Sequence, residues 1–196
     1  MPRAKAGEKT RVQFGPDDWI AAATRVLVNR SIDAVGVESL AKELGVTKGS
    51  FYWHFKDRND LLRRMLTAWR DRATEQIIAS FESRKLPPRK LIQDLLDLPS
   101  REVMAHESAS IELAIRAWGR RDEMARAVIE EVDAKRLSYI AQCFSALGFN
   151  IGDARTRAFV LYGYEVSESI VGGKSSKAQK AERRAFMERM LLSDAE

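Results

Sequence analysis

The sequence predicts an all-α fold of about nine helices, and three observations lead to it. Apolar residues recur at steps of three and four along most of the 196-residue chain, which is the period of amphipathic helices. No window alternates apolar and polar residues in the way of a half-buried strand. Prolines and glycines stand between the helical patterns, where they mark turns.

The composition is that of an ordinary globular protein, with 45% apolar residues, 31% charged residues and a net charge of +5. The single cysteine, Cys143, closes no intrachain disulfide, which favours a reducing compartment, and we interpret it as a small buried hydrophobe rather than a redox sensor. The first residues lack the apolar stretch of a secretory signal, and no apolar run approaches the ~18 residues of a membrane span. We therefore expect a cytoplasmic protein without a membrane partner.

The N-terminal part predicts three helices in quick succession. The first begins at Pro16, followed by two aspartates that suit the positive end of a helix dipole. A short helix over Val37–Leu44 ends at Gly45, since glycine is common just past a helix end. Thr47 is placed to cap the next helix, which carries residues 50–54.

Longer helices fill the rest of the chain. From residue 59 a long amphipathic helix is predicted, because apolar residues recur at every fourth position: Leu61, Met65, Trp69, Ala73, Ile77 and Phe81. Two prolines within residues 83–90 end it. Further helices are predicted near 91–98, 110–118, 122–147, 153–171 and 178–192. The helix at 122–147 is expected to turn these residues inward: Met124, Val128, Val132, Ile140 and Phe144.

The spacing of the second and third helices is that of a helix-turn-helix. Ala41 is small and lies four residues before Gly45, so the following helix can cross closely. Val46 and Phe51 are placed to fill the gap between the two helices. In such a unit the second helix enters the DNA major groove with its N-terminal residues near base edges.

The residues of this third helix suit a nucleic-acid surface. Phe51 and Phe55 are expected to point into the core, whereas Trp53 is either a packing residue or a groove contact. The residues predicted to bind DNA are small, basic or tipped with a hydrogen-bonding group: Thr47, Lys48, Gly49, Ser50, Tyr52, Trp53, His54, Lys56 and Arg58. The basic N-terminal residues form either a solvated end or an arm along nucleic acid: Arg3, Lys5, Lys9 and Arg11.

The stretch VESLAKELGVTKGSFYWHFKDRNDLL, with the SIDAVG turn before it, resembles the DNA-binding domain of the TetR family of transcriptional regulators over roughly residues 12–66. The resemblance implies DNA roles for Lys48, Ser50, Tyr52 and His54, and a contact from Arg58 to the DNA backbone. Two residues depart from the family pattern. Gly36 replaces a capping Ser or Thr, and Glu38 stands where an Arg is common, so we expect only backbone contacts from that helix.

The stretch RAWGRRDEMARAVIEEVDAKRL, followed by GF and RAFVLYGYE, resembles the regulatory domain of one branch of the same family. This resemblance implies a small-molecule pocket in each subunit and a homodimer formed through the last two helices. The candidate dimer contacts are apolar residues at helical spacing on those two helices: Phe159, Val166, Ile170, Phe186 and Met190, with Tyr162 on the same side as Phe159.

The candidate effector-binding residues are Trp69, His106, Glu112, Arg116, Trp118, Tyr139, Phe144 and Tyr162. The aromatic rings lie on inward stripes, where they are either plain core or the lining of an apolar pocket. Glu112 and Arg116 are four residues apart, so they form either a surface pair or a pair that orients a ligand. His106 is either a polar group of the pocket or an ordinary surface or capping histidine.

The sequence therefore predicts two domains, an arm and helix-turn-helix domain over 1–57 and an effector and dimerisation domain over 58–196. The favoured function is a repressor that leaves a near-palindromic double-stranded operator when an unknown small molecule binds. The alternatives are an activator of the same fold, an all-α enzyme and a helical interaction module. An enzyme is not expected, because the sequence holds no nucleophile–base pair, no cofactor motif and no metal-ligand spacing.

Overall fold

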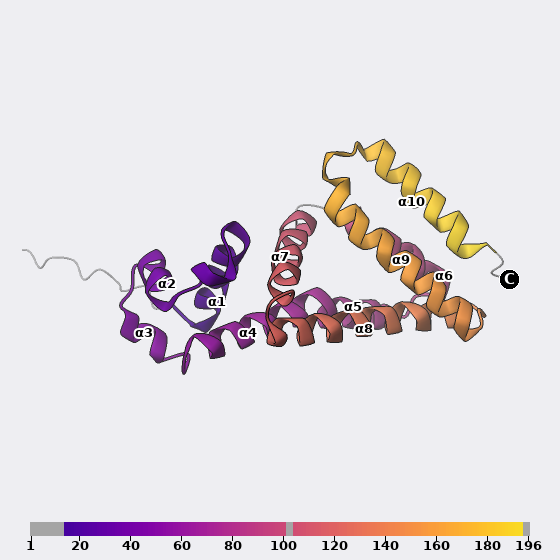
Figure 1. The fold of residues 1–196 in the computed structure, drawn as a ribbon. Helices are drawn as coiled ribbons and strands as arrows, with labels where there is room; N and C mark the ends of the chain where they lie inside the picture. The colour runs from indigo at the N-terminus through magenta and orange to yellow at the C-terminus, as the bar shows by residue number, and fades with distance from the viewer. Residues whose placement is uncertain (1–13, 101–103, 194–196) are drawn as a thin grey trace, which may run out of the picture. The chain divides into compact units, whose positions relative to one another are not determined.

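The computed structural model describes residues 14–100 and 104–193, without the side chains of residues 104–106. This part of the chain is helical throughout, with no strand, which confirms the predicted fold class (Figure 1). It forms two compact units that meet at Arg64 and Met65. The sequence places the boundary earlier, before the helix that begins at Arg58, whereas the units meet within that helix.

The α-helices are α1 Pro16–Asn29, α2 Val37–Leu44, α3 Lys48–Tyr52, α4 Arg58–Arg70, α5 Gln76–Ser83, α6 Pro88–Leu96, α7 Met104–Gly119, α8 Glu123–Ser145, α9 Ile151–Val171 and α10 Lys177–Leu192. Short turns of other helix types are η1 Ile32–Ala34, η2 Asp71–Glu75, η3 Leu98–Ser100 and η4 Gly172–Lys174. Because α4, η2 and α5 follow one another without a gap, the described residues form nine helices when these three are taken together.

In the N-terminal unit, the turn between α2 and α3 follows from Gly45. This glycine has φ of +68°, a left-handed conformation that costs other residues strain. The turn is closed by two backbone hydrogen bonds, from the Val46 N–H to the Ala41 carbonyl and from the Gly45 N–H to that of Lys42. Thr47 is the N-cap residue of α3, but its side chain makes no capping hydrogen bond.

Aromatic packing fixes α3 against the rest of this unit. The buried Phe51 ring meets the Trp19 ring of α1 edge-on at 5.3 Å and stacks on Phe55 at 5.1 Å between centroids. Such pairs add to the stabilisation that burial alone provides. The helix ends at Tyr52, so His54, expected within it, lies in the turn that follows.

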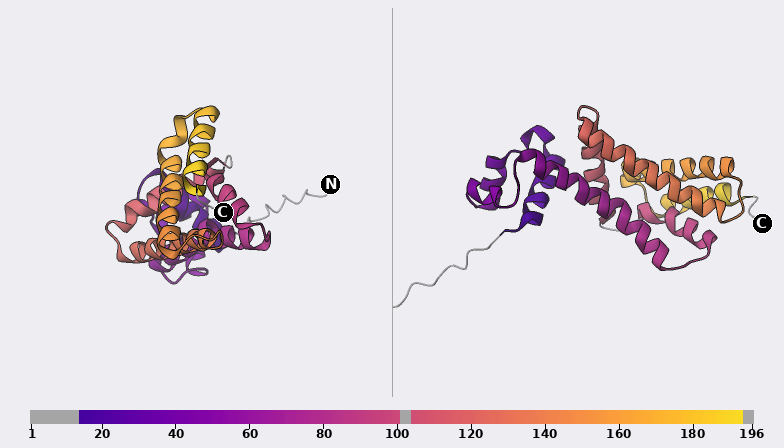
Figure 2. Two further views of the ribbon diagram at one scale, coloured as in Figure 1. Left: turned by 90° about the vertical axis from the view of Figure 1, so that its right-hand side faces the viewer. Right: turned by 90° about the horizontal axis from the view of Figure 1, so that it is seen from below.

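In the C-terminal unit, α8 packs against both α7 and α9. Helices α9 and α10 lie side by side and run antiparallel (Figures 1 and 2). The N-terminal ends of the last three helices are capped by the side chains of Asp122, Asn150 and Ser176. Buried apolar residues of α5, α6, α8, α9 and α10 form one core cluster.

The predicted long helix from residue 59 to 81 is interrupted by η2, a short π-helix. A π turn adds one residue, so local carbonyls lose their usual partners and become available to side chains. The carbonyl of Ala73 is used in this way, since it accepts a hydrogen bond from Arg136. Among all described helices, none is both long and apolar enough to cross a membrane.

Candidate functional site

The first turn of α3 exposes a small polar surface. Thr47, Lys48 and Gly49 are exposed, and Ser50 is half-buried. A Cβ placed on Gly49 would approach only the Thr47 hydroxyl, at 3.7 Å. The backbone of this turn is therefore accessible, which suits close approach to another molecule.

Two large aromatic side chains continue the exposed surface of α3. The Tyr52 side chain is 54% exposed, and Trp53, directly after the helix, is 84% exposed. The alternative that Trp53 is a packing residue is therefore wrong within the described residues; that packing role belongs to Phe51 and Phe55. An exposed tyrosine hydroxyl and indole N–H are donors that DNA phosphates accept.

Lys48 is held by Glu38, the residue that departs from the family pattern. The ammonium nitrogen lies 2.6 Å from a Glu38 carboxylate oxygen. This hydrogen bond lowers the pKa of Glu38 and raises that of Lys48. Both side chains are exposed, so the pair is weak and screened by salt. Glu38 is thus a competitor for any anion that Lys48 meets.

Arg58 has a structural role that the sequence did not indicate. Its guanidinium is half-buried and donates hydrogen bonds to the carbonyls of Val35 and Ile32, at 2.5 and 2.6 Å. Arg58 therefore joins the start of α4 to η1. Of the other predicted DNA residues, Lys56 is exposed and His54 is half-buried with its ring edge toward Phe55. The N-terminal basic residues lie outside the described part.

In the C-terminal unit, Glu112, Arg116 and Tyr162 are brought together, and two further residues complete what we call the polar network: Asp133 and Arg136. Arg116 binds Asp133 at 2.6 Å, Glu112 at 2.8 Å and the Tyr162 hydroxyl at 2.9 Å. Tyr162 in turn donates to Asp133 at 2.6 Å. The network thus joins α7, α8 and α9.

The network favours the ionised form of Asp133 and the charged form of Arg116. The hydrogen bond to Asp133 raises the pKa of Arg116 above its usual range. Burial opposes ionisation of Asp133, but hydrogen bonds from Arg116 and Tyr162 outweigh it, and the pKa of Asp133 is lowered. Burial raises the pKa of Tyr162, so its hydroxyl keeps the proton that it donates.

Arg136 connects the network to η2. One of its terminal nitrogens contacts both Glu112 oxygens at 3.0 Å. The other donates to the Ala73 carbonyl at 3.0 Å, and Nε donates to the buried Thr74 hydroxyl at 3.1 Å. Arg136 therefore joins the polar network to η2, which directly follows α4 in the chain.

Glu165 lies one helical turn after Tyr162, beside the polar network but not paired with it. Its Oε1 atom is enclosed and has no hydrogen-bond partner among the described residues. Burial raises the pKa of Glu165 to about 8, with Arg136 opposing and Glu112 reinforcing the shift. Glu165 is therefore an interior acid that the fold does not neutralise.

The other predicted effector residues are mostly core. Trp69, Trp118 and Phe144 are buried, and Phe144 belongs to the apolar cluster. Tyr139 is half-buried beside the Phe81 ring, and burial raises its pKa to about 12. The structure does not group these four with the polar network. The His106 side chain lies outside the described part of the chain.

Cys143 is buried, and burial raises the pKa of its thiol to about 11. A thiol that stays protonated is a poor nucleophile, which agrees with its interpretation as a small buried hydrophobe.

The candidate dimer residues divide into two groups. Phe159 and Phe186 are 70% and 56% exposed, and Ile170 and Met190 are exposed as well. Val166 is half-buried. The expectation that Tyr162 shares the outer face of Phe159 is wrong, because its hydroxyl is drawn inward by Asp133. These exposed apolar side chains of α9 and α10 leave a surface that water solvates poorly.

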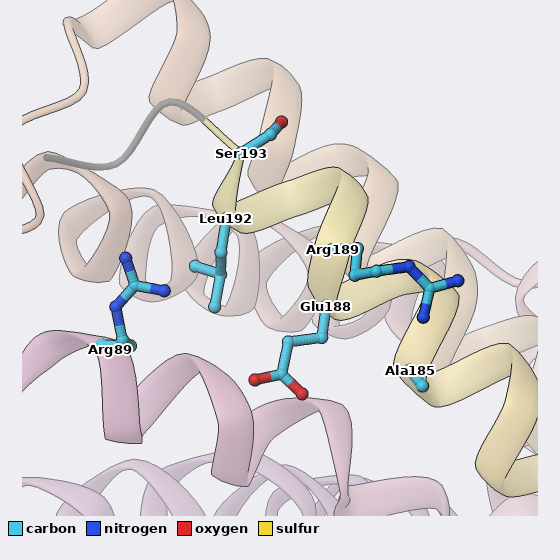
Figure 3. A pocket seen from close by; sticks show the side chains of 6 residues that line it. All are labelled: Arg89, Ala185, Glu188, Arg189, Leu192 and Ser193. Atoms are coloured by element: carbon cyan, nitrogen blue, oxygen red, sulfur yellow. The ribbon is translucent and has the colours of Figure 1, made fainter.

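A groove of about 460 Å³ lies between α6 and α10 (Figure 3). It is lined by Arg89, Ala185, Glu188, Arg189, Leu192 and Ser193. Ligand sites are lined predominantly by apolar and aromatic groups. The largely charged and polar lining makes this groove a poorer candidate for an effector than the interior of the unit.

Sequence reasoning missed four residues of the interior site: Thr74, Asp133, Arg136 and Glu165. A signal for Arg136 was present. It lies on the inward stripe of Val132 and Ile140, at the four-residue step between them. A charged residue at a core position of a helix needs buried partners, and Glu112 of α7 is one of them.

Comparison with known proteins agrees with this arrangement. Residues 20–65 match the family model of bacterial regulatory proteins of the tetR family. The HTH-type transcriptional regulator PksA of Bacillus subtilis is 27% identical over 108 residues, which cover 55% of this chain and 50% of that protein. The chain thus spans about half the length of this curated relative.

Solved structures match the fold over nearly the whole chain. A transcriptional regulator from Rhodococcus sp. Rha1 superposes with a TM-score of 0.72 at 15% identity, covering 93% of this chain and 98% of that one. A transcriptional regulator from Saccharomonospora viridis, solved in complex with choline, gives a TM-score of 0.72 at 18% identity, with 91% and 96% covered. At these identities the likeness concerns the fold.

Proposed function

We propose that the chain is a homodimeric, effector-responsive transcriptional regulator of the TetR family and not an enzyme, which the match of residues 20–65 to that family's model supports. The observation that carries the proposal is the surface of α3, where Lys48, Tyr52 and Trp53 are exposed while Phe51 anchors the helix from behind. A short helix held in this way can enter the major groove with its first turn toward the bases.

The roles along α3 follow from position. Lys48 and Ser50, in the first turn, read base edges, and Thr47 and Gly49 let the backbone approach. Tyr52, Trp53 and His54 bind phosphates at the far end, with Lys56 adding charge. Arg58 contributes through the η1 carbonyls that it holds as well as through charge. Phosphate contacts set the position on DNA, whereas contacts to base edges discriminate between sequences.

Dimerisation through α9 and α10 completes the DNA-binding unit. The exposed apolar residues Phe159, Ile170, Phe186 and Met190 support this pairing, with Val166 at the edge of the same surface. Pairing of the same surface on two copies gives a two-fold axis and four helices in contact. Two recognition helices related by that axis suit a near-palindromic operator with half-sites roughly 34–36 Å apart.

The interior of the C-terminal unit is the proposed effector site. Structural neighbours include a regulator solved with choline, which supports a small molecule as the effector. Effector binding rearranges the polar network, and Arg136 transmits the change to η2 and the end of α4. An effector that binds one conformation better shifts the population toward it and releases DNA. We propose a repressor in the bacterial cytoplasm; an activator of the same fold is the second candidate.

In vitro selection from a random duplex pool tests this function with the full chain. Selection is expected to return an inverted repeat bound by two protomers, and Lys48→Ala is expected to weaken its binding. Lys174→Ala, which removes an exposed lysine from the C-terminal unit, is the matched control and is expected to bind as the wild type does. A pool that shows no enrichment for any duplex would remove the DNA-binding proposal.

A further inference from the structure

The polar network and the adjacent Glu165, in the interior of the C-terminal unit, contain one more acidic than basic side chain. The polar network and the adjacent Glu165 contain three acids, Glu112, Asp133 and Glu165, and two bases, Arg116 and Arg136. With every group ionised, the sum is −3 + 2 = −1. An unpaired charge away from water is costly, so such a site either holds a proton or receives a cation.

Most hydrogen-bond donors of the two arginines are already used within the site. Each nitrogen of Arg116 already donates to Glu112, Asp133 or Tyr162. Those of Arg136 donate to Glu112 and Tyr162, and to the Thr74 hydroxyl and Ala73 carbonyl. A carboxylate or phosphate would compete for these arginines with the acids that they already bind. The unused group at this site is an acceptor, the enclosed Oε1 of Glu165.

The polar network is partly exposed to solvent. The side chains of Glu112, Arg116 and Asp133 keep 20%, 28% and 31% of their accessible surface. A ligand can therefore reach the network from solvent, although Oε1 itself is enclosed in the free protein. Buried apolar residues adjoin the network in the sequence, Ile115 next to Arg116 and Val132 next to Asp133, and they favour an effector with a hydrocarbon body.

We propose that Glu165 anchors an effector that carries a protonated amine on an apolar body. The ammonium donates an N–H hydrogen bond to Oε1 and takes the place of the carboxyl proton, so the sum of charges at the site stays at zero. Ionisation of Glu165 places a carboxylate beside the polar network, whose Arg136 is hydrogen-bonded to the Ala73 carbonyl of η2. This inference rests on the proposed function, because it names the chemical class of that effector.

Proton release accompanies binding. In the free protein, burial leaves the Glu165 carboxyl mostly protonated at neutral pH, with Arg136 of α8 and Glu112 of α7 as the charged groups that act on it. An ammonium ion requires the carboxylate, so one proton leaves as the amine enters. With a pKa of about 8, the ionised fraction rises about 50-fold between pH 6 and pH 8, and the apparent affinity for the amine should rise with it.

Isothermal titration calorimetry on the full chain tests the proposal with three amines, benzylamine, cyclohexylamine and octylamine, each beside its matched alcohol. At least one amine is expected to bind about 30-fold or more tightly than its alcohol. Glu165→Gln is expected to lose that preference, whereas Glu130→Gln, at an exposed position of α8, should keep it. Titration of the wild type in buffers of different ionisation enthalpy reports the released proton without any variant.

Three results would overturn the proposal: no amine binds at millimolar concentration, an amine binds Glu165→Gln as well as the wild type, or benzoate binds better than benzylamine. Duplex binding is measured on the same preparations, so the two proposals fail separately. If the chain binds DNA but no amine, the proposed function is supported and the amine class of effector is refuted. If the chain binds an amine through Glu165 but binds no DNA, the amine site is supported and the proposed function as a DNA-binding regulator is refuted.

Discussion

Glu165→Gln should change how the stability of the folded chain depends on pH. The folded protein holds the Glu165 proton up to about pH 8, whereas the ordinary pKa of the group is 4.5. Between these values the folded state binds more protons than the unfolded state, so the free energy of unfolding falls as pH rises. The stabilisation of the folded state by the protonated Glu165 is complete below pH 4.5 and is lost as pH rises through about 8. Glutamine has the same shape without the charge.

The magnitude follows from the pKa shift at 1.36 kcal/mol per pH unit. Through Glu165 alone, the wild type should lose on the order of 2 kcal/mol between pH 5 and pH 7. Glu165→Gln has no such loss, so the free energy of unfolding of the variant rises relative to that of the wild type by this amount over the same pH range. Other groups titrate in both proteins, so the difference between the two cancels their contribution.

The assay is urea unfolding followed by circular dichroism at pH 5, 6, 7 and 8, at one protein concentration because dimerisation stabilises the folded state. Glu130→Gln serves as the control and should show no pH-dependent difference from the wild type. A Glu165→Gln difference that stays constant, or that reverses in favour of the wild type at pH 8, would refute the reasoning. It would mean that the Glu165 carboxylate is ionised and paired in the folded chain.

Three further outcomes are expected. Glu38→Gln should tighten duplex binding several-fold at low salt, because Lys48 is freed from its intramolecular partner; equal affinity in a fluorescence anisotropy titration would show that the pair does not compete with DNA. Lys48→Ala should cost ~1–3 kcal/mol and relax preference at one base position, whereas Tyr52→Phe should weaken all duplexes about equally; the same loss of discrimination in both would contradict their roles. Phe186→Glu should give monomers in light scattering, since it places a charge in the dimer contact of α10, while Ile151→Glu, at an exposed position of α9, should stay dimeric; a Phe186→Glu variant that stays dimeric would show that the interface lies elsewhere.

The helix-turn-helix could be predicted from the sequence because its determinants are local. The bounds of α2, Val37–Leu44, agree with prediction, since Gly45 and Ala41 act within a few residues of the turn. The buried positions of Phe51 and Phe55 follow from the same spacing. By contrast, Arg58 forms hydrogen bonds to Ile32 of η1 and to Val35, which follows η1, more than twenty positions earlier, and no local sequence pattern predicts them.

The interior site could be predicted only in part, because its partners are distant in sequence. Glu112 and Arg116 form a visible pair at helical spacing, but Asp133, Arg136 and Tyr162 join them only when α7, α8 and α9 pack. Apolar periodicity assigns a side chain to a helix face and does not say which polar group of another helix it will meet. The inward turn of Tyr162, away from the outer face of Phe159, is a consequence of this limit.

The most direct test of the account is the salt dependence of duplex binding by the wild type. Fluorescence anisotropy with the selected inverted repeat, and with an unrelated duplex of equal length, gives the two binding constants at several salt concentrations. If six or more phosphates are neutralised per dimer, the logarithm of the binding constant should fall with that of salt at a slope of about −5 or steeper, and the inverted repeat should stay preferred. A slope near zero, or equal affinity for both duplexes, would contradict the claim that this chain is a DNA-binding regulator.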